Sequence, residues 1–354
     1  MKVFCPRPSR WLAIAVLALM VTALTTVTTA ADAPDQSGTE MLRSARRSYV
    51  NILVRGRMVG SGCWISRHGD VLTAVHVLGR ANEGIEILTM AERRIKAKIV
   101  AVDLGADLAL LRVEGSKDDF PALQLAKKKP VVGEKLHLFG APLFRRGLVT
   151  SGTVATDTPS FEYAEGQYIE SMLIAGFGPP GTSGGPWINR RGRLVGVQSA
   201  SVTIGYAPQG FAAAATLSAI ERLLSTREDA TVTGFGAAVE ELWQQELALL
   251  DQLPEGTTGL LVRILEKGGP ADLAGVAQWD IIQSIDGKPT TTINQFLRYV
   301  RGKTPGEEIE LELVDRRGKN PHTATIALGQ IIRRPLSPPD EPKDQKKVAE
   351  PKPN

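Results

Sequence analysis

The sequence is poor in cysteine. Among its 354 residues only Cys5 and Cys63 are cysteine, and Cys5 lies in the N-terminal segment described below. Cys63 therefore has no partner for an internal disulfide, and a zinc site built on several cysteines is excluded. We expect no metal ion and no cofactor, and we expect the folded parts of the chain to be stabilised by packing.

The chain also has little excess charge. Its formal net charge is +4, but three of its 42 basic residues, Lys2, Arg7 and Arg10, lie in the first ten positions. Without residues 1–30, which contain no acidic residue, 39 basic residues face 38 acidic ones. Proteins that bind nucleic acid usually have a clear basic excess, so this balance argues against a nucleic-acid partner.

Only one long apolar run is present, near the N-terminus. The uncharged stretch from Trp11 to Ala31 follows a basic start and ends in small residues, which is the pattern of an export signal cleaved after about residues 30–33. The stretch is also long enough for an uncleaved membrane anchor, so residues 11–31 leave that alternative open. Either interpretation places the rest of the chain outside the cytoplasm.

The length is about twice that of a usual domain of roughly 150 residues, which indicates two folded domains. A polar stretch, Ser225–Thr231, separates them. The last residues are rich in proline and lysine, so we expect them to be disordered. The predicted organisation is a signal peptide or anchor at 1–31, a linker at 32–46, a first domain at 47–228, a second domain at 232–330 and a disordered tail at 331–354.

The first domain consists of short apolar or alternating runs separated by turn signals. This spacing is typical of antiparallel β structure, and two barrels of similar size fit the span. The first set of predicted strands is Val50–Val54, Gly62–Ile65, Val71–Val75, Ile85–Met90 and Ile95–Val102, and a second set runs from Lys135 to Val197.

The second domain has a mixed pattern, which predicts an α+β fold. In its last helix the apolar residues Ile293, Phe296, Leu297 and Val300 lie on one face. The other predicted elements of the C-terminal half are a helix at Thr216–Leu224, a helical stretch at Glu240–Leu250 and strands at Leu260–Ile264, Ile281–Ile285 and Ile309–Val314.

The string Gly181-Thr182-Ser183-Gly184-Gly185-Pro186 is the most informative one in the chain. A serine hydroxyl becomes a good nucleophile only when a base removes its proton, and the oxyanion that forms needs donors aimed at it in advance. Glycines beside the serine permit a tight turn that points backbone N–H groups inward. We expect the amides of Gly181 and Ser183 to be these donors. A glycine-rich hairpin with an inert serine is the alternative.

A base and an orienting carboxylate complete the pattern. Of the four histidines, His76 follows an apolar strand, where a purely structural role is the alternative. Asp107 precedes the apolar run Leu108–Leu111 and should be drawn inward, where a charge needs a partner such as His76. Asp103 is the competing carboxylate, with a surface turn as its preferred interpretation.

With these motifs the chain resembles the trypsin-like serine proteases, in which His, Asp and Ser occur in this order. Gly60-Ser61-Gly62 and the absence of a cysteine after His76 resemble the HtrA/Deg branch. The resemblance runs from about Ser48 to Leu328 and implies a mainly β fold, a chymotrypsin-like double six-stranded β-barrel protease domain followed by an α+β PDZ domain. It also implies a homotrimer or a multiple of one.

The second domain has the sequence features that support the PDZ part of this resemblance. Gly268-Gly269-Pro270-Ala271 and Asp286-Gly287-Lys288-Pro289 are similar to PDZ motifs of the HtrA type. In that family a glycine-containing loop binds a peptide carboxylate and the groove adds the peptide as a strand. The matching residues are Gly234, Phe235, Gly236 and Ala237, for which an interdomain linker turn is the alternative.

The residues that would recognise the substrate are predicted from their positions relative to Ser183. Phe177 lies six residues before Ser183, and an apolar lining there disfavours charged side chains and favours small or medium aliphatic ones. We expect Ser199, Ala200 and Ser201 to pair with the substrate backbone. The chain departs from the family pattern at Thr182, at Gly176–Pro180 beside the oxyanion hole, and at Trp279 in the PDZ-like domain.

The function expected from these residues is that of an exported, periplasmic serine endopeptidase. It would cleave unfolded or damaged proteins with His76, Asp107 and Ser183, while the PDZ domain binds peptide C-termini. The alternative is a catalytically weak peptide-binding chaperone or scaffold on a protease fold. An anchored protease that cuts one specific partner is a third option, which depends on whether residues 11–31 are retained.

Overall fold

The computed structural model describes residues 36–115, 119–156, 158–164, 166–204 and 207–333. The predicted signal at 1–31 and most of the predicted tail lie outside the described residues. The chain divides into two compact units, Met1–Leu42 and Arg43–Asn354, and helix α2 (Gln36–Ser48) includes residues of both. Among the described residues no helix is both long enough and apolar enough to span a membrane.

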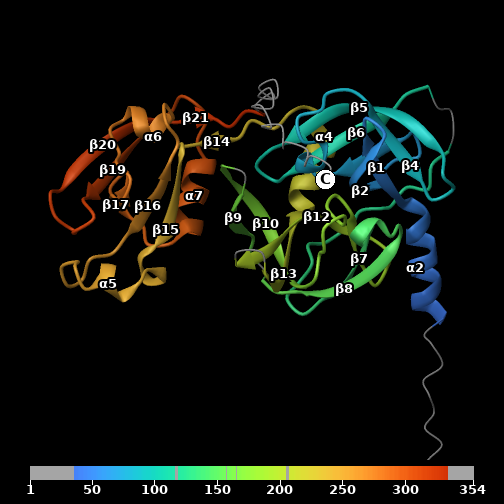
Figure 1. Ribbon diagram of the computed structural model, residues 1–354, viewed down its shortest axis with the longest axis horizontal. Helices are drawn as coiled ribbons and strands as arrows, with labels where there is room; N and C mark the ends of the chain where they lie inside the picture. Colours follow the sequence, from blue (N-terminus) through green and yellow to red (C-terminus); the bar gives the residue numbers. More distant parts are fainter. Residues whose placement is uncertain (1–35, 116–118, 157, 165, 205–206, 334–354) are drawn as a thin grey trace, which may run out of the picture. The chain divides into compact units, whose positions relative to one another are not determined.

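Six antiparallel strands form a first closed barrel in the order β1-β2-β3-β6-β5-β4 (blue to cyan in Figure 1). Its interior contains apolar side chains that alternate with outward-facing ones, as β5 illustrates with buried Ile95 and Ala97 between exposed neighbours. The strands are β1 (Tyr49–Val54), β2 (Arg57–Trp64), β3 (Asp70–Thr73), β4 (Ile85–Thr89), β5 (Arg94–Asp103) and β6 (Leu108–Val113).

A second set of strands forms a sheet in the order β13-β12-β11-β7-β8-β10-β9, and pairing of β13 with β10 closes six of them into a ring. The predicted double six-stranded β-barrel is therefore confirmed. The strands are β7 (Lys135–Gly140), β8 (Leu148–Val154), β9 (Ser160–Ala164), β10 (Gln167–Gly176), β11 (Pro186–Asn189), β12 (Leu194–Ile204) and β13 (Ala207–Thr216), and the short helix η1 (Pro142–Phe144) follows β7.

The C-terminal part is α+β, as predicted. Its main sheet has the order β15-β16-β17-β19-β20, with β18 paired to β17, and β14 pairs with β21. The apolar face of α7 is buried through Phe296, Leu297 and Val300. The elements are α4 (Leu217–Thr226), β14 (Thr233–Gly234), β15 (Ala237–Glu241), η2 (Leu242–Gln244), α5 (Leu247–Leu250), β16 (Leu260–Leu265), α6 (Pro270–Leu273), β17 (Ile281–Ile285), β18 (Lys288–Pro289), α7 (Ile293–Arg301), β19 (Glu308–Val314), β20 (His322–Ala327) and β21 (Gly329–Gln330).

The predicted helical stretch Glu240–Leu250 is wrong at its first two residues. Glu240 and Glu241 continue β15 and pair with Leu261 and Leu260 of β16. Only η2 and the single turn of α5 are helical in that stretch. Pairing with a buried neighbouring strand outweighed the helix preference of two glutamates, which is a weak local preference.

A buried ion-pair network joins α4 to the first barrel. The carboxylate of Asp70, on β3, accepts two hydrogen bonds from Arg112 (2.7 and 2.9 Å) and two from Arg227 (3.0 and 3.3 Å). Arg227 ends α4 in a left-handed conformation. Burial alone would raise the pKa of Asp70, but the hydrogen bonds from Arg112, Arg227 and Ser66 outweigh it and lower the pKa to about 2.

The Asp70→Asn substitution tests this network. The folded-state pKa of about 2 lies below the ordinary value of 3.8, so the network stabilises the fold fully above about pH 4. That contribution, on the order of 2 kcal/mol, is lost as the pH falls through about 2. Urea unfolding from pH 6 to pH 2 should therefore show a steep loss of stability in the wild type and a shallower one in Asp70→Asn. Equal slopes would contradict this account.

Candidate active site

Ser183 lies on a tight loop between β10 and β11 that the first barrel holds in place. Ser61, on β2, donates its backbone N–H to the carbonyl of Ser183 (2.8 Å) and its hydroxyl to the carbonyl of Gly181 (2.8 Å). Gly184 donates its N–H to the carbonyl of Gln198 (2.7 Å). Both barrels therefore fix the position of the serine. In the sequence, Ser61 stands out only as part of the string Gly60-Ser61-Gly62, which does not indicate this role.

Two glycines on the loop are required by geometry. Gly181 has φ +97°, and a Cβ there would lie 2.3 Å from the carbonyl oxygen of Ala141. Gly184 has φ +81°, and a Cβ there would lie 2.2 Å from the carbonyl oxygen of Ser61. Any side chain at either position would displace the loop.

The loop leaves two backbone donors free. Among the described residues, neither the N–H of Gly181 nor that of Ser183 donates a hydrogen bond. Buried or half-buried N–H groups are almost always paired, so two unpaired donors beside one serine suit an external acceptor. This is the arrangement that an oxyanion hole requires.

His76 and Asp107 meet at the edge of the first barrel. Strand β3 ends at Thr73, and the one-turn helix α3 (Val75–Leu78) carries His76. The ring Nδ1 of His76 lies 2.6 Å from Oδ2 of Asp107, and the backbone N–H of His76 donates to Oδ1 (2.9 Å). Asp107 is 4% exposed, as the sequence analysis expected of a carboxylate before an apolar run.

A third group binds the same carboxylate. The hydroxyl of Ser199, on β12, donates to Oδ2 of Asp107 (2.5 Å). The register of β12 against β13 shifts between Gln198 and Ala200, so Ser199 lies at a bulge. A bulge redirects a side chain, and here it leads to a contact with the other barrel. Ser199 was predicted only as a substrate-pairing residue, because no local pattern marks a strand serine as a carboxylate partner.

The competing carboxylate, Asp103, is not the surface-turn residue that the sequence analysis preferred. It is 2% exposed and forms an ion pair with Arg222 of α4 (2.7 Å). Its partners, Arg222 and the backbone N–H of Ala106, are structural. Asp103 ends β5, and its ion pair with the distant Arg222 accounts for its burial.

The predicted recognition residues line the same cavity as His76, Asp107 and Ser183. Phe177 is 46% exposed, and Ala200 is also exposed. The hydroxyl of Ser201 donates to the carbonyl of Gly178 (2.6 Å), which joins β12 to the segment before the serine. Phe177, Ser199, Ala200 and Ser201 thus line one cavity with His76, Asp107 and Ser183.

Gln198 is a buried residue that packs beside the segment before the serine, a position that the sequence did not indicate. Its side chain accepts a hydrogen bond from Trp187 Nε1 (2.7 Å) and donates one to the carbonyl of Ala200 (2.8 Å). A Cβ on Gly178 would lie 2.5 Å from the Gln198 amide nitrogen. Because the Gln198 amide is held in place by these hydrogen bonds, the residue that packs against it must be glycine. This accounts for Gly178 in the segment Gly176–Pro180.

Comparison with known proteins agrees with this geometry. A family model described as a trypsin-like peptidase domain matches residues 60–197, and one described as a PDZ domain matches residues 262–315. The chain therefore has a trypsin-like peptidase domain followed by a PDZ domain, and it is similar to proteases of the HtrA/Deg type. A relative from Ectopseudomonas mendocina, named a probable periplasmic serine endoprotease DegP-like, is 32% identical over 264 residues, which cover 72% of this chain and 53% of that protein.

Other relatives give the same result. A protein of the same name from Chlamydia trachomatis is 30% identical over 277 residues, which cover 75% of this chain and 53% of that protein. The chain thus spans about half the length of the curated relatives it matches. Among solved structures, the HtrA-type protease AlgW with a decapeptide has a TM-score of 0.59 at 19% identity, covering 83% of this chain and 99% of that one. A serine endoprotease from Yersinia pestis has a TM-score of 0.57 at 23% identity, covering 83% and 98%. These two likenesses concern the fold.

The predicted peptide-binding loop of the PDZ domain lies between β14 and β15. Gly236 has φ +80°, and among the described residues neither its N–H nor that of Phe235 donates a hydrogen bond. The Phe235 ring packs edge-on against Phe296 of α7 (4.8 Å). Gly234–Ala237, together with Leu297 and Val300 of α7, line the same continuous cavity as His76 and Ser183.

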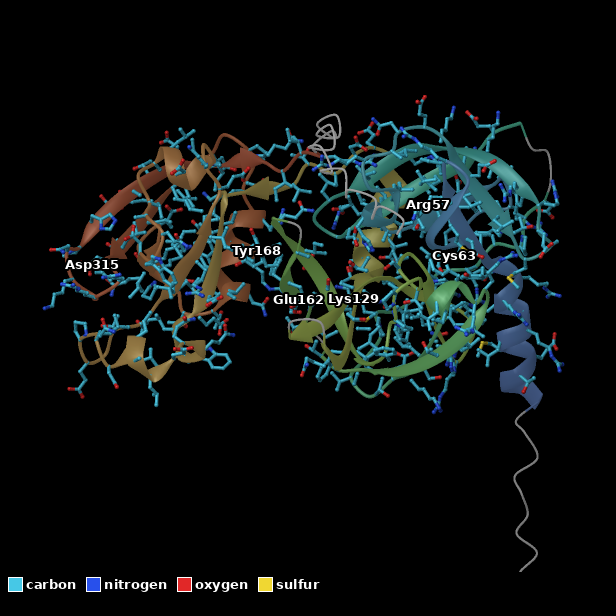
Figure 2. The ribbon with its side chains drawn as sticks, viewed as in Figure 1. Arg57, Cys63, Lys129, Glu162, Tyr168 and Asp315 are labelled. Atoms are coloured by element: carbon cyan, nitrogen blue, oxygen red, sulfur yellow. The ribbon has the colours of Figure 1, made fainter. Side chains whose placement is uncertain are left out.

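A tyrosine hydroxyl occupies part of the edge next to this loop. β15 is an edge strand, and the hydroxyl of Tyr168, on β10 and labelled in Figure 2, accepts a hydrogen bond from the N–H of Val239 (2.7 Å) and donates one to its carbonyl (2.9 Å). Tyr168 is 5% exposed. These are the two backbone groups that an added strand would use at this position.

The Tyr168→Phe substitution tests this contact. Removal of the hydroxyl leaves both backbone groups of Val239 without a partner, so hydrogen exchange of the Val239 amide should become about tenfold faster, corresponding to roughly 1.4 kcal/mol. Tyr163→Phe is the matched control, because the Tyr163 hydroxyl has no hydrogen bond among the described residues while its ring packs on Tyr168 (5.1 Å). Equal exchange rates in wild type and Tyr168→Phe would contradict the contact.

Proposed function

We propose that the protein is a serine endopeptidase in which Ser183 is the nucleophile, His76 the general base and Asp107 the residue that orients His76. The observation that carries this proposal is the 2.6 Å contact of the His76 ring with the buried carboxylate of Asp107, in a cavity that Ser183 also lines. The names of the relatives support the reaction class.

The reaction would proceed by acyl transfer. Ser183 Oγ attacks the carbonyl carbon of the scissile peptide bond while His76 Nε2 takes its proton, and Asp107 stabilises the imidazolium through Nδ1–H. The backbone N–H groups of Gly181 and Ser183 bind the oxyanion. His76 then gives its proton to the leaving amine as the C–N bond breaks. A water molecule, deprotonated by His76, hydrolyses the acyl-enzyme.

The substrates of this reaction would be unfolded or damaged polypeptides, because a peptide must lie extended to pair with the backbone of β12. The β11–β12 ladder ends at Val197, so no strand among the described residues pairs with Ser199–Ser201 on that side. The exposed Phe177 ring offers an apolar surface but no charge, which favours small or medium aliphatic side chains before the cut. Cleavage sites in an unfolded substrate, read by mass spectrometry, check this preference.

The PDZ domain would bind peptide C-termini through the loop Gly234–Ala237 and the edge of β15. Tyr168 would have to leave Val239 before a peptide could pair along that strand. Location in the periplasm is supported by the names of the relatives and by the export-type sequence of residues 1–31. A homotrimer, and a membrane anchor formed by residues 11–31, stay predictions.

Replacing the nucleophile tests the proposal. Ser183→Ala should remove casein cleavage, with a loss on the order of a millionfold, because the serine and the histidine act as one unit. Its melting temperature should stay near that of the wild type, since among the described residues the Ser183 hydroxyl makes one long hydrogen bond, to the carbonyl of Ser199 (3.4 Å). Casein cleavage by Ser183→Ala at the wild-type rate would refute the assignment. A wild type that cleaves nothing and resists a serine-directed fluorophosphonate would favour the peptide-binding scaffold.

A second variant tests the oxyanion hole. Gly181→Ala places a Cβ against the Ala141 carbonyl and should displace the Gly181 N–H, lowering kcat by about a hundredfold to a thousandfold, as the loss of one oxyanion donor does. Gly133→Ala is the matched control, because Gly133 also has a positive φ, +84°, but no atom lies within 4 Å of its added Cβ. An equal kcat in the two variants would contradict the assigned donor.

A further inference from the structure

Three fully buried polar residues lie on the two strands that hold the loop of Ser183. Tyr49 and Asn51 belong to β1 and Ser61 belongs to β2, where Asn51 and Ser61 are cross-strand neighbours. Ser61 binds the loop directly, whereas Tyr49 and Asn51 make no hydrogen bond to it among the described residues. Burying polar side chains is costly unless their hydrogen bonds are satisfied, so the partners of these three residues are informative.

The hydrogen bonds of this group run in determined directions. A guanidinium group can only donate, so Arg146 Nε binds the amide oxygen of Asn51 (2.9 Å). The amide nitrogen of Asn51 then faces the Tyr49 hydroxyl, to which it donates (2.6 Å). At the other end a carbonyl can only accept, so Ser61 Oγ donates to the carbonyl of Gly181 (2.8 Å).

The Tyr49 hydroxyl connects these two ends. Its oxygen accepts from Asn51, so its proton is left for Ser61 Oγ, which lies 3.2 Å away. The hydroxyl keeps this proton at neutral pH, because burial raises the pKa of Tyr49 and outweighs the lowering by hydrogen bonds with Ser61 and Asn51. Arg146, Asn51, Tyr49 and Ser61 therefore form a directed series of donors, here called the donor network, which ends on the Gly181 carbonyl.

Gly181 is the residue whose position the donor network fixes. Glycine has the widest choice of backbone conformations, and Gly181 has φ +97°. Its carbonyl accepts two hydrogen bonds, from the Ser61 hydroxyl (2.8 Å) and from the N–H of Ala141 (3.2 Å). The N–H and the carbonyl of one residue share a single Cα, so a carbonyl held in place also limits where the N–H points. That N–H is one of the two proposed oxyanion donors.

The donor network is well suited to hold a backbone group. Its three inner members are fully buried, so water does not compete for their hydrogen bonds. Hydrogen bonds in series also polarise one another, which makes the Ser61 hydroxyl a better donor than it would be alone. Its outer member, Arg146, is partly exposed and lies between β7 and β8. The network thus starts in the second barrel, passes through the first and returns to the loop of Ser183.

We propose that Tyr49 is a positioning residue for the oxyanion hole, which acts through Ser61 on the carbonyl of Gly181 and keeps the Gly181 N–H aimed at the reacting oxygen. The proposal rests on the function proposed above, in which this N–H binds the oxyanion. It assigns to a buried residue of the first barrel a part in a reaction that takes place on a loop of the second.

Kinetics of Tyr49→Phe test this role, because the substitution removes the O–H and keeps the ring. The substrate for the full-length protein is a fluorogenic peptide with the sequence of a casein site that the wild type cleaves. Reactive Ser183 is counted by labelling to completion with a serine-directed fluorophosphonate, and kcat is expressed per labelled site. Misfolded molecules therefore do not lower the measured kcat. The other variants are Ser61→Ala, the double variant of Tyr49→Phe and Ser61→Ala, Arg146→Met and Tyr299→Phe.

We expect Tyr49→Phe to lower kcat about tenfold and to leave KM unchanged, since an oxyanion donor acts in the transition state. The loss is smaller than the hundredfold or more that a missing donor causes, on the order given by oxyanion-hole variants, because the Ala141 N–H still holds the carbonyl. The double variant should have the same kcat as Ser61→Ala, since the tyrosine acts through the serine. Tyr299→Phe is the matched control. Its hydroxyl donates to Asp286 (2.7 Å) in the C-terminal domain, so its kcat should equal that of the wild type.

Three outcomes would overturn the proposal. A kcat of Tyr49→Phe equal to that of the wild type would remove the role of Tyr49 and leave the reaction proposed for Ser183 standing. A double variant in which the two separate losses multiply would show that Tyr49 does not act through Ser61. A wild type that is neither labelled nor active would refute the proposed function itself, and the role of the donor network with it.

Arg146→Met decides the matter where Tyr49→Phe yields no site that can be labelled. This variant withdraws the outer donor of the network from a partly exposed position and leaves the buried residues in place. A lower kcat per labelled site at unchanged KM would support the donor network. A kcat equal to that of the wild type would contradict it.

Discussion

The carboxylate of Asp107 is the contact on which the site depends. It lies in hydrogen-bond contact with the ring Nδ1 of His76 and accepts a hydrogen bond from the backbone N–H of the same residue, which belongs to the first barrel. It also accepts a hydrogen bond from the hydroxyl of Ser199, which belongs to the second barrel. A buried charge with several donors is stable only while all of them stay in place, so this carboxylate links the positions of the two barrels. The imidazole is thereby oriented in the cavity that also contains Ser183.

The loop that carries Ser183 is held by a second, independent set of contacts. Ser61 binds two carbonyls of the loop, and glycines at 181 and 184 allow backbone approaches that a side chain would prevent. These bonds take up carbonyl groups and leave the N–H groups of Gly181 and Ser183 free. A preorganised donor pair costs no rearrangement when negative charge develops, which is the physical basis of its proposed role.

Much of this could be predicted from the sequence, for reasons that differ between parts. Strand periodicity and turn residues predicted the barrels, and the motifs around His76, Asp107 and Ser183 predicted which residues would meet. The roles of Ser61, Ser199 and Gln198 could not be predicted, because each acts through a contact between segments far apart in the chain. The strand at Glu240 and Glu241 was missed for the same reason, since a neighbouring strand determines it. The burial of Asp103 depends on Arg222, which lies 119 positions later.

The most direct test of the central contact is the rate at which a serine-directed fluorophosphonate labels Ser183 in the wild type and in Asp107→Asn. An amide at position 107 keeps the shape of the side chain but removes the charge that stabilises the His76 imidazolium. The account predicts labelling of Ser183 in the wild type and a decrease of up to about ten-thousandfold in Asp107→Asn, with the fold retained. Labelling of the variant at the wild-type rate would contradict it.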